Sequence, residues 1–145
     1  MEDFVPYELA LKLKDKGFRK PCIATYDKDG MLGYNYVQPT SIRAVGFEEC
    51  LVYSNDCVMA PTISQVLKWL REEKKIFVTI NIGYCYESDE IPFPTNPKME
   101  PILKGYYYGI WELDNLNDKN GRSEYFETPE LATLAGIKYT IDNLI

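Results

Sequence analysis

Residues 60–82 read APTISQVLKWLREEKKIFVTINI and predict a helix followed directly by a strand. Thr62 stands three residues before Gln65, and this spacing is the capping-box pattern of a helix N-terminus. Apolar residues then recur at intervals of three and four, as one buried stripe requires: Ile63, Val66, Leu67 and Leu70. The run IFVTINI at 76–82 is rich in β-branched residues, so it predicts a strand.

A second strand is predicted at residues 104–113, which read KGYYYGIWEL. We expect it to pair with the strand at 76–82 across the segment 83–103. Four prolines exclude regular helix and central strand from that segment: Pro92, Pro94, Pro97 and Pro101. A loop of this length in a small domain is typical of a functional flap or a disordered segment.

Helices are predicted toward both ends of the chain. Residues 4–18 place apolar side chains at helical spacing, with Pro6 in the first turn and Gly17 at the end. Residues 128–144 open with Thr-Pro-Glu, which supplies an N-cap, a proline at the first helical position and an acid in the first turn. Gly136 inside this helix costs about 1 kcal/mol relative to alanine, so we expect it to permit close packing against the sheet.

The segment between the first two helices predicts short strands. Asp-Gly at 29–30 lies between β-forming residues and indicates a hairpin with strands near 22–27 and 31–37. Residues 42–45 and 50–53 are further candidates for short strands, while 54–56 resemble a turn. The resulting order predicts an α+β fold, with a largely antiparallel sheet of four or more strands and about three helices packed mainly on one face. We expect residues 1–145 to form a single domain.

Composition excludes several kinds of chemistry. The 145 residues include no histidine, which removes Ser-His-Asp and Cys-His catalysis, His-ligated zinc and imidazole pH switching. Sixteen basic against 22 acidic residues give a net charge of −6, and no stretch forms a basic stripe, so nucleic-acid binding is disfavoured. The N-terminal residues carry acids where an export signal needs bases, and the apolar runs are too short for a membrane span.

These features predict a cytoplasmic protein, with neither a membrane nor a nucleic acid as partner. Four cysteines, Cys22, Cys50, Cys57 and Cys85, contain no CxxC pair. A four-thiolate zinc site usually takes its ligands as close pairs, so we expect reduced and mostly buried thiols instead.

No cluster of residues predicts catalysis, a metal or a cofactor. Asp27-x-Asp29-Gly30 resembles the opening of a calcium loop, but Gln38 stands where the closing glutamate would be, so it indicates a turn. Glu87, Asp89 and Glu90 lie in the proline-rich segment, where rigid and different environments for two carboxylates are not expected. We therefore predict no catalytic residue, and the protein is more in keeping with a non-enzyme.

Tyrosine is the outlier of the composition, with 12 copies. Strand alternation sends Tyr106, Tyr108 and Ile110 to one face and Tyr107, Gly109 and Trp111 to the other. Tyr84 and Tyr86 follow the neighbouring strand and are expected to join the aromatic patch. One interpretation is that cross-strand aromatic pairs stabilise the sheet. The other is a binding surface for a partner, a second subunit or a flat ligand, formed by these residues: Tyr84, Tyr86, Tyr106, Tyr107, Tyr108 and Trp111.

Three segments carry a resemblance to known sequences: LALKLKDKGF at 9–18, APTISQVLKWLREE at 60–73 and YFETPELATLAGIKYTIDNLI at 125–145. Through them the chain resembles a group of small proteins of unknown function from phages and prophage-like elements of gut bacteria. The resemblance implies a cytoplasmic setting and an accessory role, with no functional residues to transfer.

Three hypotheses about function follow. The leading one is a non-enzymatic binding protein, with a protein partner or a homodimer formed through the aromatic face. The second is a small hydrolase or transferase that uses carboxylates near the 83–103 loop. The third is an acidic inhibitor or nucleic-acid mimic that binds a basic protein, as the acidic net charge would allow.

Overall fold

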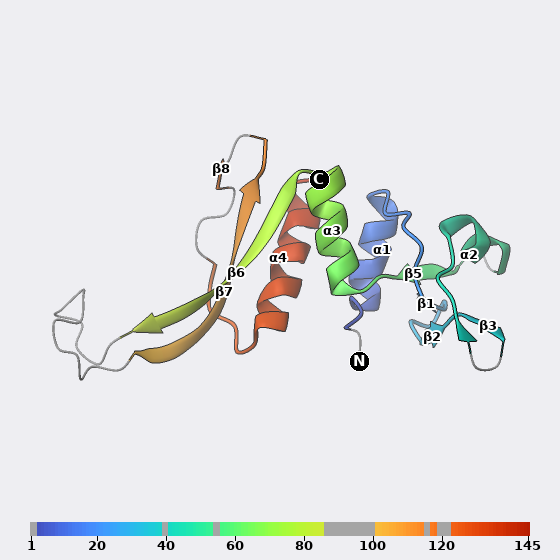
Figure 1. Ribbon diagram of the computed structural model, residues 1–145, viewed down its shortest axis with the longest axis horizontal. Coiled ribbons are helices and arrows are strands. Elements are labelled where there is room, and N and C mark those ends of the chain that lie inside the picture. The colour runs from blue at the N-terminus through green and yellow to red at the C-terminus, as the bar shows by residue number, and fades with distance from the viewer. Residues whose placement is uncertain (1–2, 39–40, 54–55, 86–100, 115–116, 119–122) are drawn as a thin grey trace. The chain divides into compact units, whose positions relative to one another are not determined.

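The computed structural model describes residues 3–38, 41–53, 56–85, 101–114, 117–118 and 123–145 (Figure 1). The fold divides into two compact units. The first unit comprises Met1–Lys74 together with Lys138–Ile145, and the second comprises Lys75–Ile137. The last helix, α4 (Pro129–Asn143), contributes residues to both units.

The first unit holds three further helices and five short strands in its described residues. In chain order they are α1 (Tyr7–Asp15), β1 (Ala24–Tyr26), β2 (Leu32–Tyr34), β3 (Tyr36–Gln38), β4 (Ser41–Ile42), α2 (Phe47–Tyr53), β5 (Val58–Ala60) and α3 (Ile63–Glu73). β1 is the central strand of an antiparallel sheet and pairs with both β2 and β5, whereas β3 and β4 form a separate pair. Leu13, Phe18 and Trp69 are fully buried in the core of this unit.

The β1–β2 hairpin confirms the turn predicted at Asp-Gly. The Asp27 carboxylate accepts hydrogen bonds from the backbone N–H groups of Asp29 and Met31, at 2.8 and 2.9 Å. Gly30 has φ +79°, a conformation that glycine adopts without steric cost. Asp27 therefore stabilises the turn. Within the described ranges, no three or more side chains of the types that bind metals lie grouped together.

The predicted capping box at the start of α3 is confirmed. The Thr62 hydroxyl accepts a hydrogen bond from the Gln65 backbone N–H at 3.2 Å, and the Gln65 side chain accepts one from the Thr62 N–H at 3.0 Å. Both bonds satisfy amide groups that have no partner inside the helix. After α3, Lys75 takes a left-handed conformation with φ 58° and starts the turn into the next strand.

The second unit is built on a long antiparallel hairpin. β6 (Ile76–Cys85) pairs with β7 (Ile102–Glu112) from Ile76 opposite Glu112 to Cys85 opposite Ile102, and β8 (Asn117–Asp118) pairs with the far edge of β7. Figure 1 shows β6 and β7 lying side by side along their whole length. The predicted pairing is confirmed, with strands that extend into both ends of the segment 83–103.

The α+β class and the antiparallel pairing are confirmed, but the arrangement of the strands differs from the prediction. A single sheet of four or more strands was expected, whereas no sheet in the described part of the chain exceeds three strands. The β1–β2 hairpin takes β5 as its third strand and the β6–β7 hairpin takes β8, so the two hairpins belong to separate three-stranded sheets. Four helices are present within the described ranges, one more than expected. The single domain over 1–145 stays a prediction.

The predicted strand at 50–53 is wrong, because these residues belong to α2. The prediction of reduced thiols is also wrong for two of the four cysteines. The Cα atoms of Cys50, in α2, and Cys57, just before β5, lie 5.9 Å apart, and the two residues form a disulfide. Cys22 and Cys85 are free thiols.

Among the described residues, no helix is both long enough and apolar enough to cross a membrane.

Candidate functional site

The two faces of the β6–β7 hairpin differ in burial. On one face, Val78, Tyr108 and Ile110 are buried, and the first part of α4 covers them. Gly136 of α4 approaches this face closely, because a Cβ atom there would lie 2.7 Å from Cγ1 of Val78. The close packing expected at Gly136 is therefore confirmed.

The opposite face carries large aromatic side chains in contact with solvent. Phe77 and Trp111 are directly opposite each other in the register, and they remain 42% and 40% exposed. Cross-strand aromatic neighbours of this kind stabilise a sheet, and adjacent exposed aromatic side chains are also typical of a protein-binding surface. This pair forms one end of the surface that we call the open face.

A second aromatic pair lies further along the same face. The rings of Tyr107 and Tyr125 are edge to face, with centroids 6.1 Å apart and an interplanar angle of 84°. Tyr125 comes from the segment that follows β8 and packs directly over Gly83, where a Cβ atom would collide with its ring. Glycine at position 83 thus makes room for the second pair.

Polar groups lie between the two aromatic pairs. The Thr79 hydroxyl donates to the Gly109 carbonyl at 3.3 Å, and the Asn81 amide donates to the Thr79 hydroxyl at 3.4 Å. Thr79 and Asn81 are both half-buried. We define the open face by the residues that share it: Phe77, Thr79, Asn81, Gly83, Tyr107, Gly109, Trp111 and Tyr125.

The six residues predicted as a binding surface do not all lie together. Tyr107 and Trp111 share the open face, as the alternation predicts, whereas Tyr106 and Tyr108 belong to the face that α4 covers. Tyr84 is 57% exposed and follows a register shift in β6. Tyr86 lies outside the described residues. The sequence prediction missed Phe77 and Tyr125, and only the strand register could have identified Phe77.

Acidic residues outnumber basic residues in the second unit. Residues 75–137 contain ten acidic and five basic side chains, so this unit carries most of the net negative charge of the chain. Glu112 adjoins Trp111 in the sequence and Glu124 adjoins Tyr125. Because neighbours on a strand point to opposite faces, Glu112 lies on the other face from Trp111, and the acidic balance is a property of the second unit as a whole.

The carboxylates considered for catalysis cannot be placed in a site. Glu87, Asp89 and Glu90 all lie outside the described residues. The buried Cys22 thiol has a pKa raised to about 12 by desolvation, which keeps it protonated and a poor nucleophile. Cys22 is therefore not a candidate nucleophile.

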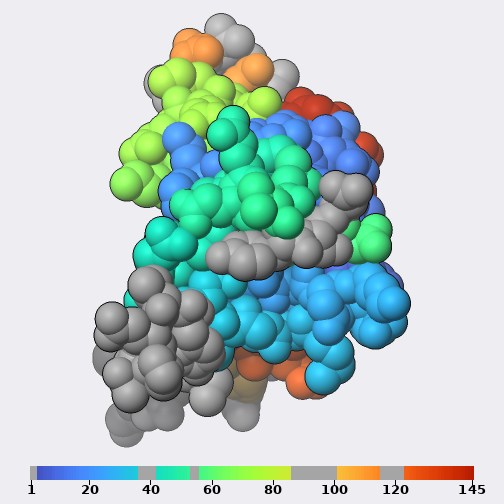
Figure 2. All heavy atoms as spheres, turned by 90° about the vertical axis from the view of Figure 1, so that its right-hand side faces the viewer, coloured from blue at the N-terminus to red at the C-terminus, as the bar shows by residue number. Residues whose placement is uncertain are grey.

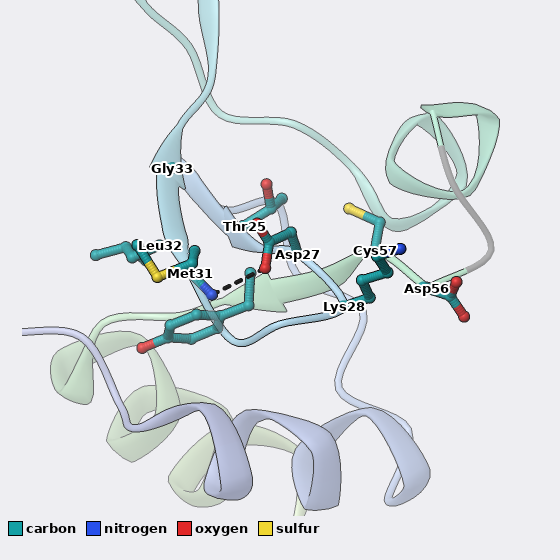
Figure 3. A pocket seen from close by; sticks show the side chains of 9 residues that line it. Thr25, Asp27, Lys28, Met31, Leu32, Gly33, Asp56 and Cys57 are labelled. Carbon is teal, nitrogen blue, oxygen red and sulfur yellow. Dashed lines mark hydrogen bonds between the residues drawn. The ribbon is translucent and has the colours of Figure 1, made fainter.

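Two cavities adjoin the disulfide of the first unit. One, of about 320 Å³, is lined by the β1–β2 hairpin with Asp56 and Cys57. Figure 3 shows Lys28, Asp27 and Asp56 around it. The other, of about 260 Å³, is lined by these residues: Thr25, Tyr34, Asn35, Arg43, Val45, Cys50 and Cys57.

Comparison with known proteins gives no family for this chain: no family model, no curated protein and no solved structure matches it.

Proposed function

We propose that the chain is a non-enzymatic binding protein whose open face recognises a segment of a partner protein with basic and apolar side chains. The observation that carries this proposal is the exposure of Phe77 and Trp111 on the sheet face opposite to the one that Gly136 of α4 packs against. Tryptophan and other aromatic residues contribute much of the binding energy at protein interfaces, because they bury a large area with few rotatable bonds.

The arrangement of the open face supports a segment that lies along the strands. Its aromatic pairs are four residues apart on β7, at Tyr107 and Trp111, which corresponds to roughly 13 Å along a strand. Thr79 and Asn81 supply hydroxyl and amide groups between them. A partner segment would place apolar side chains against the two pairs and hydrogen-bond to the polar groups in the middle.

Charge favours a basic partner over a second copy of the chain. With ten acidic and five basic side chains in the second unit, two copies joined through their open faces would bring like charges together. A partner with lysine or arginine next to its apolar residues would gain attraction instead, and arginine could also stack on the exposed rings. A basic partner of this kind fits both the binding hypothesis and the acidic-inhibitor hypothesis.

The proposal includes a cytoplasmic location and an accessory role in a phage or prophage, as the resemblance of the segments 9–18, 60–73 and 125–145 implies. Disulfides are uncommon in the cytosol, where thiols are kept reduced. The bond between Cys50 and Cys57 would therefore be exposed to cellular thiols in that compartment.

A random peptide display library tests the proposal. The library is selected on the wild-type chain and counter-selected on a Phe77→Ser, Trp111→Ser variant. Val52→Ser serves as the matched control, because Val52 is an exposed apolar residue of the first unit, at 83%. Sedimentation of the chain alone measures self-association in parallel.

We expect the selected peptides to be enriched in arginine or lysine beside apolar residues. They should bind the Val52→Ser control as well as the wild type, lose at least tenfold in affinity for the double variant, and weaken as salt rises. Peptides without basic enrichment, or peptides that bind the double variant equally well, would refute the proposal. A concentration-dependent dimer that the double variant abolishes would show that the open face binds a second copy.

A further inference from the structure

The helix α2 is held in place mainly by its disulfide. Of the α2 side chains that the structure describes, Cys50 alone is fully buried, at 1% exposed. Val52 is exposed, and so are Glu48 and Glu49. Phe47 and Leu51 are half-buried, so this short helix gains only a limited free energy from apolar burial. The covalent bond to Cys57, the residue before β5, is therefore its main attachment.

The two cysteines of the disulfide differ in burial. Cys57 is half-buried and lines both cavities, whereas Cys50 is fully buried. Figure 2 shows that α2 and the β1–β2 hairpin lie at the surface of this face of the first unit. A small molecule in the cavity of about 320 Å³ would meet Cys57 alone, and in the cavity of about 260 Å³, which both cysteines line, Cys57 is the less buried of the two.

Charge distinguishes the two routes to Cys57. The cavity of about 260 Å³ is lined by Arg43 together with both cysteines. The cavity of about 320 Å³ is lined by two carboxylates, Asp27 and Asp56, against one ammonium group, on Lys28. Arg43 also pairs with Glu49 at 2.7 Å, but both side chains are half exposed, so this ion pair is weak and leaves other guanidinium donors free to attract an anion.

We propose that the Cys50–Cys57 disulfide is a thiol–disulfide exchange site, and that an anionic low-molecular-weight thiol reaches it through the cavity lined by Arg43. The thiolate of the small molecule attacks Sγ of Cys57. A new S–S bond forms between the small thiol and Cys57 while the Cys50–Cys57 bond breaks, and Cys50 leaves as a thiolate that takes a proton from water. A second small thiol completes the reduction by attacking the mixed disulfide, which releases Cys57 as a thiolate and the small molecule as its own disulfide.

Exchange at this site releases the main attachment of α2. Once the bond is broken, α2 retains its half-buried Phe47 and Leu51 side chains and two surface contacts, the stacking of Arg19 on the Phe47 ring and the exposed Arg43–Glu49 pair. Each such contact contributes about 1 kcal/mol or less at a surface. Exchange should therefore loosen α2 while leaving the open face in the second unit unchanged, which separates this inference from the proposed binding function.

The first experiment locates the adduct on the wild-type chain. Free thiols are blocked with iodoacetamide, the native protein is treated with 2-mercaptoethanesulfonate, newly released thiols are alkylated with a heavy form of the reagent, and peptides are mapped by mass spectrometry. We expect the sulfonate adduct on Cys57 and the heavy label on Cys50. An adduct on Cys50, a reaction that needs denaturant, or a purified protein without the Cys50–Cys57 bond would each overturn the proposal.

The second experiment tests the route. The rate of reduction of the disulfide, divided by the concentration of reagent present as thiolate, is compared for two small thiols. These are 2-mercaptoethanesulfonate, which is anionic, and cysteamine, which is cationic. We expect the anionic thiol to react about threefold faster in the wild type because of the positive charge at Arg43. Arg43→Gln should remove this preference and Glu49→Gln should increase it, while Lys68→Gln, on the exposed side of α3, should not change it.

Circular dichroism of each variant serves as the control for correct folding. A preference for cysteamine would place the entry in the cavity of Asp27 and Asp56 and contradict the proposed route. An unchanged preference in Arg43→Gln would contradict the role of the guanidinium.

Discussion

The two tryptophans of the chain lie in opposite environments. Trp69 is 2% exposed and packs edge to face on Phe18 at 5.4 Å, whereas Trp111 is 40% exposed on the open face. The fluorescence of each indole therefore reports on a different part of the molecule. Alternation along 106–111 correctly placed Trp111 opposite Tyr108, because side chains on a strand change face at every residue. It could not reveal Tyr125, which reaches the open face from outside the hairpin.

Acrylamide quenching measures this difference directly. In a Trp69→Phe variant the remaining emission comes from Trp111, and we expect it to be red-shifted and severalfold more easily quenched than that of a Trp111→Phe variant. The reason is that acrylamide reaches an exposed indole and is excluded from a buried one. Equal quenching in the two folded variants would show that the open face is covered.

Gly136 supports a prediction about packing at the residue scale. A Cβ atom at this position would lie 2.7 Å from Val78 and 3.1 Å from the Tyr108 ring. Gly136→Ala gains about 1 kcal/mol of helix propensity, but overpacking costs about 1–3 kcal/mol. We expect a net loss of about 1 kcal/mol in the free energy of unfolding, as these opposing effects imply. Gly46→Ala is the control, since nothing lies within 4 Å of its Cβ position, and a stabilised Gly136→Ala variant would contradict the packing.

At the scale of single elements, α3 and α4 could be predicted closely, because their signals are local. Thr62 caps α3 as expected, and the Thr128 hydroxyl accepts a hydrogen bond from the Leu131 N–H at 3.1 Å at the start of α4. Residues 47–53 could not be predicted in the same way. β-branched and aromatic residues there favour a strand, and the helix is held by the disulfide to Cys57, a residue outside it.

The capping box gives the prediction for α3. Thr62→Ala removes the acceptor for the Gln65 N–H, so we expect a loss of about 1 kcal/mol in the free energy of unfolding by urea denaturation. Thr62→Ser keeps the hydroxyl and should retain most of the stability. Ser64→Ala changes an exposed position on the same helix and should have little effect. If Thr62→Ala is as stable as the wild type, the cap does not stabilise α3 as the geometry implies.

At the scale of the whole molecule, the class could be predicted but the division of strands could not. Hairpin signals are local, whereas which hairpins share a sheet depends on pairings that sequence patterns do not encode. The chain forms two units, yet α4 contributes buried residues to both, Ala132 and Ile137 in one and Thr140 and Ile141 in the other. A helix shared in this way should couple the two units in unfolding.

We therefore expect one cooperative urea transition. Trp69 reports on the first unit and Trp111 on the second, so single-tryptophan variants follow each unit separately. The two fluorescence midpoints should coincide with that of the far-ultraviolet circular dichroism after correction for the stability of each variant. Two separated transitions would show that the units unfold independently and that residues 1–145 are two domains.

The central claim, that the open face binds a partner segment, is tested most directly by the emission of Trp111 during binding. The Trp69→Phe variant is titrated with a tryptophan-free peptide obtained by selection on the wild-type chain, and acrylamide quenching is recorded at each step. The account predicts a saturable blue shift and a fall in quenching, because the peptide covers the exposed indole of Trp111. A peptide that binds while the emission and quenching of Trp111 stay unchanged would contradict the claim.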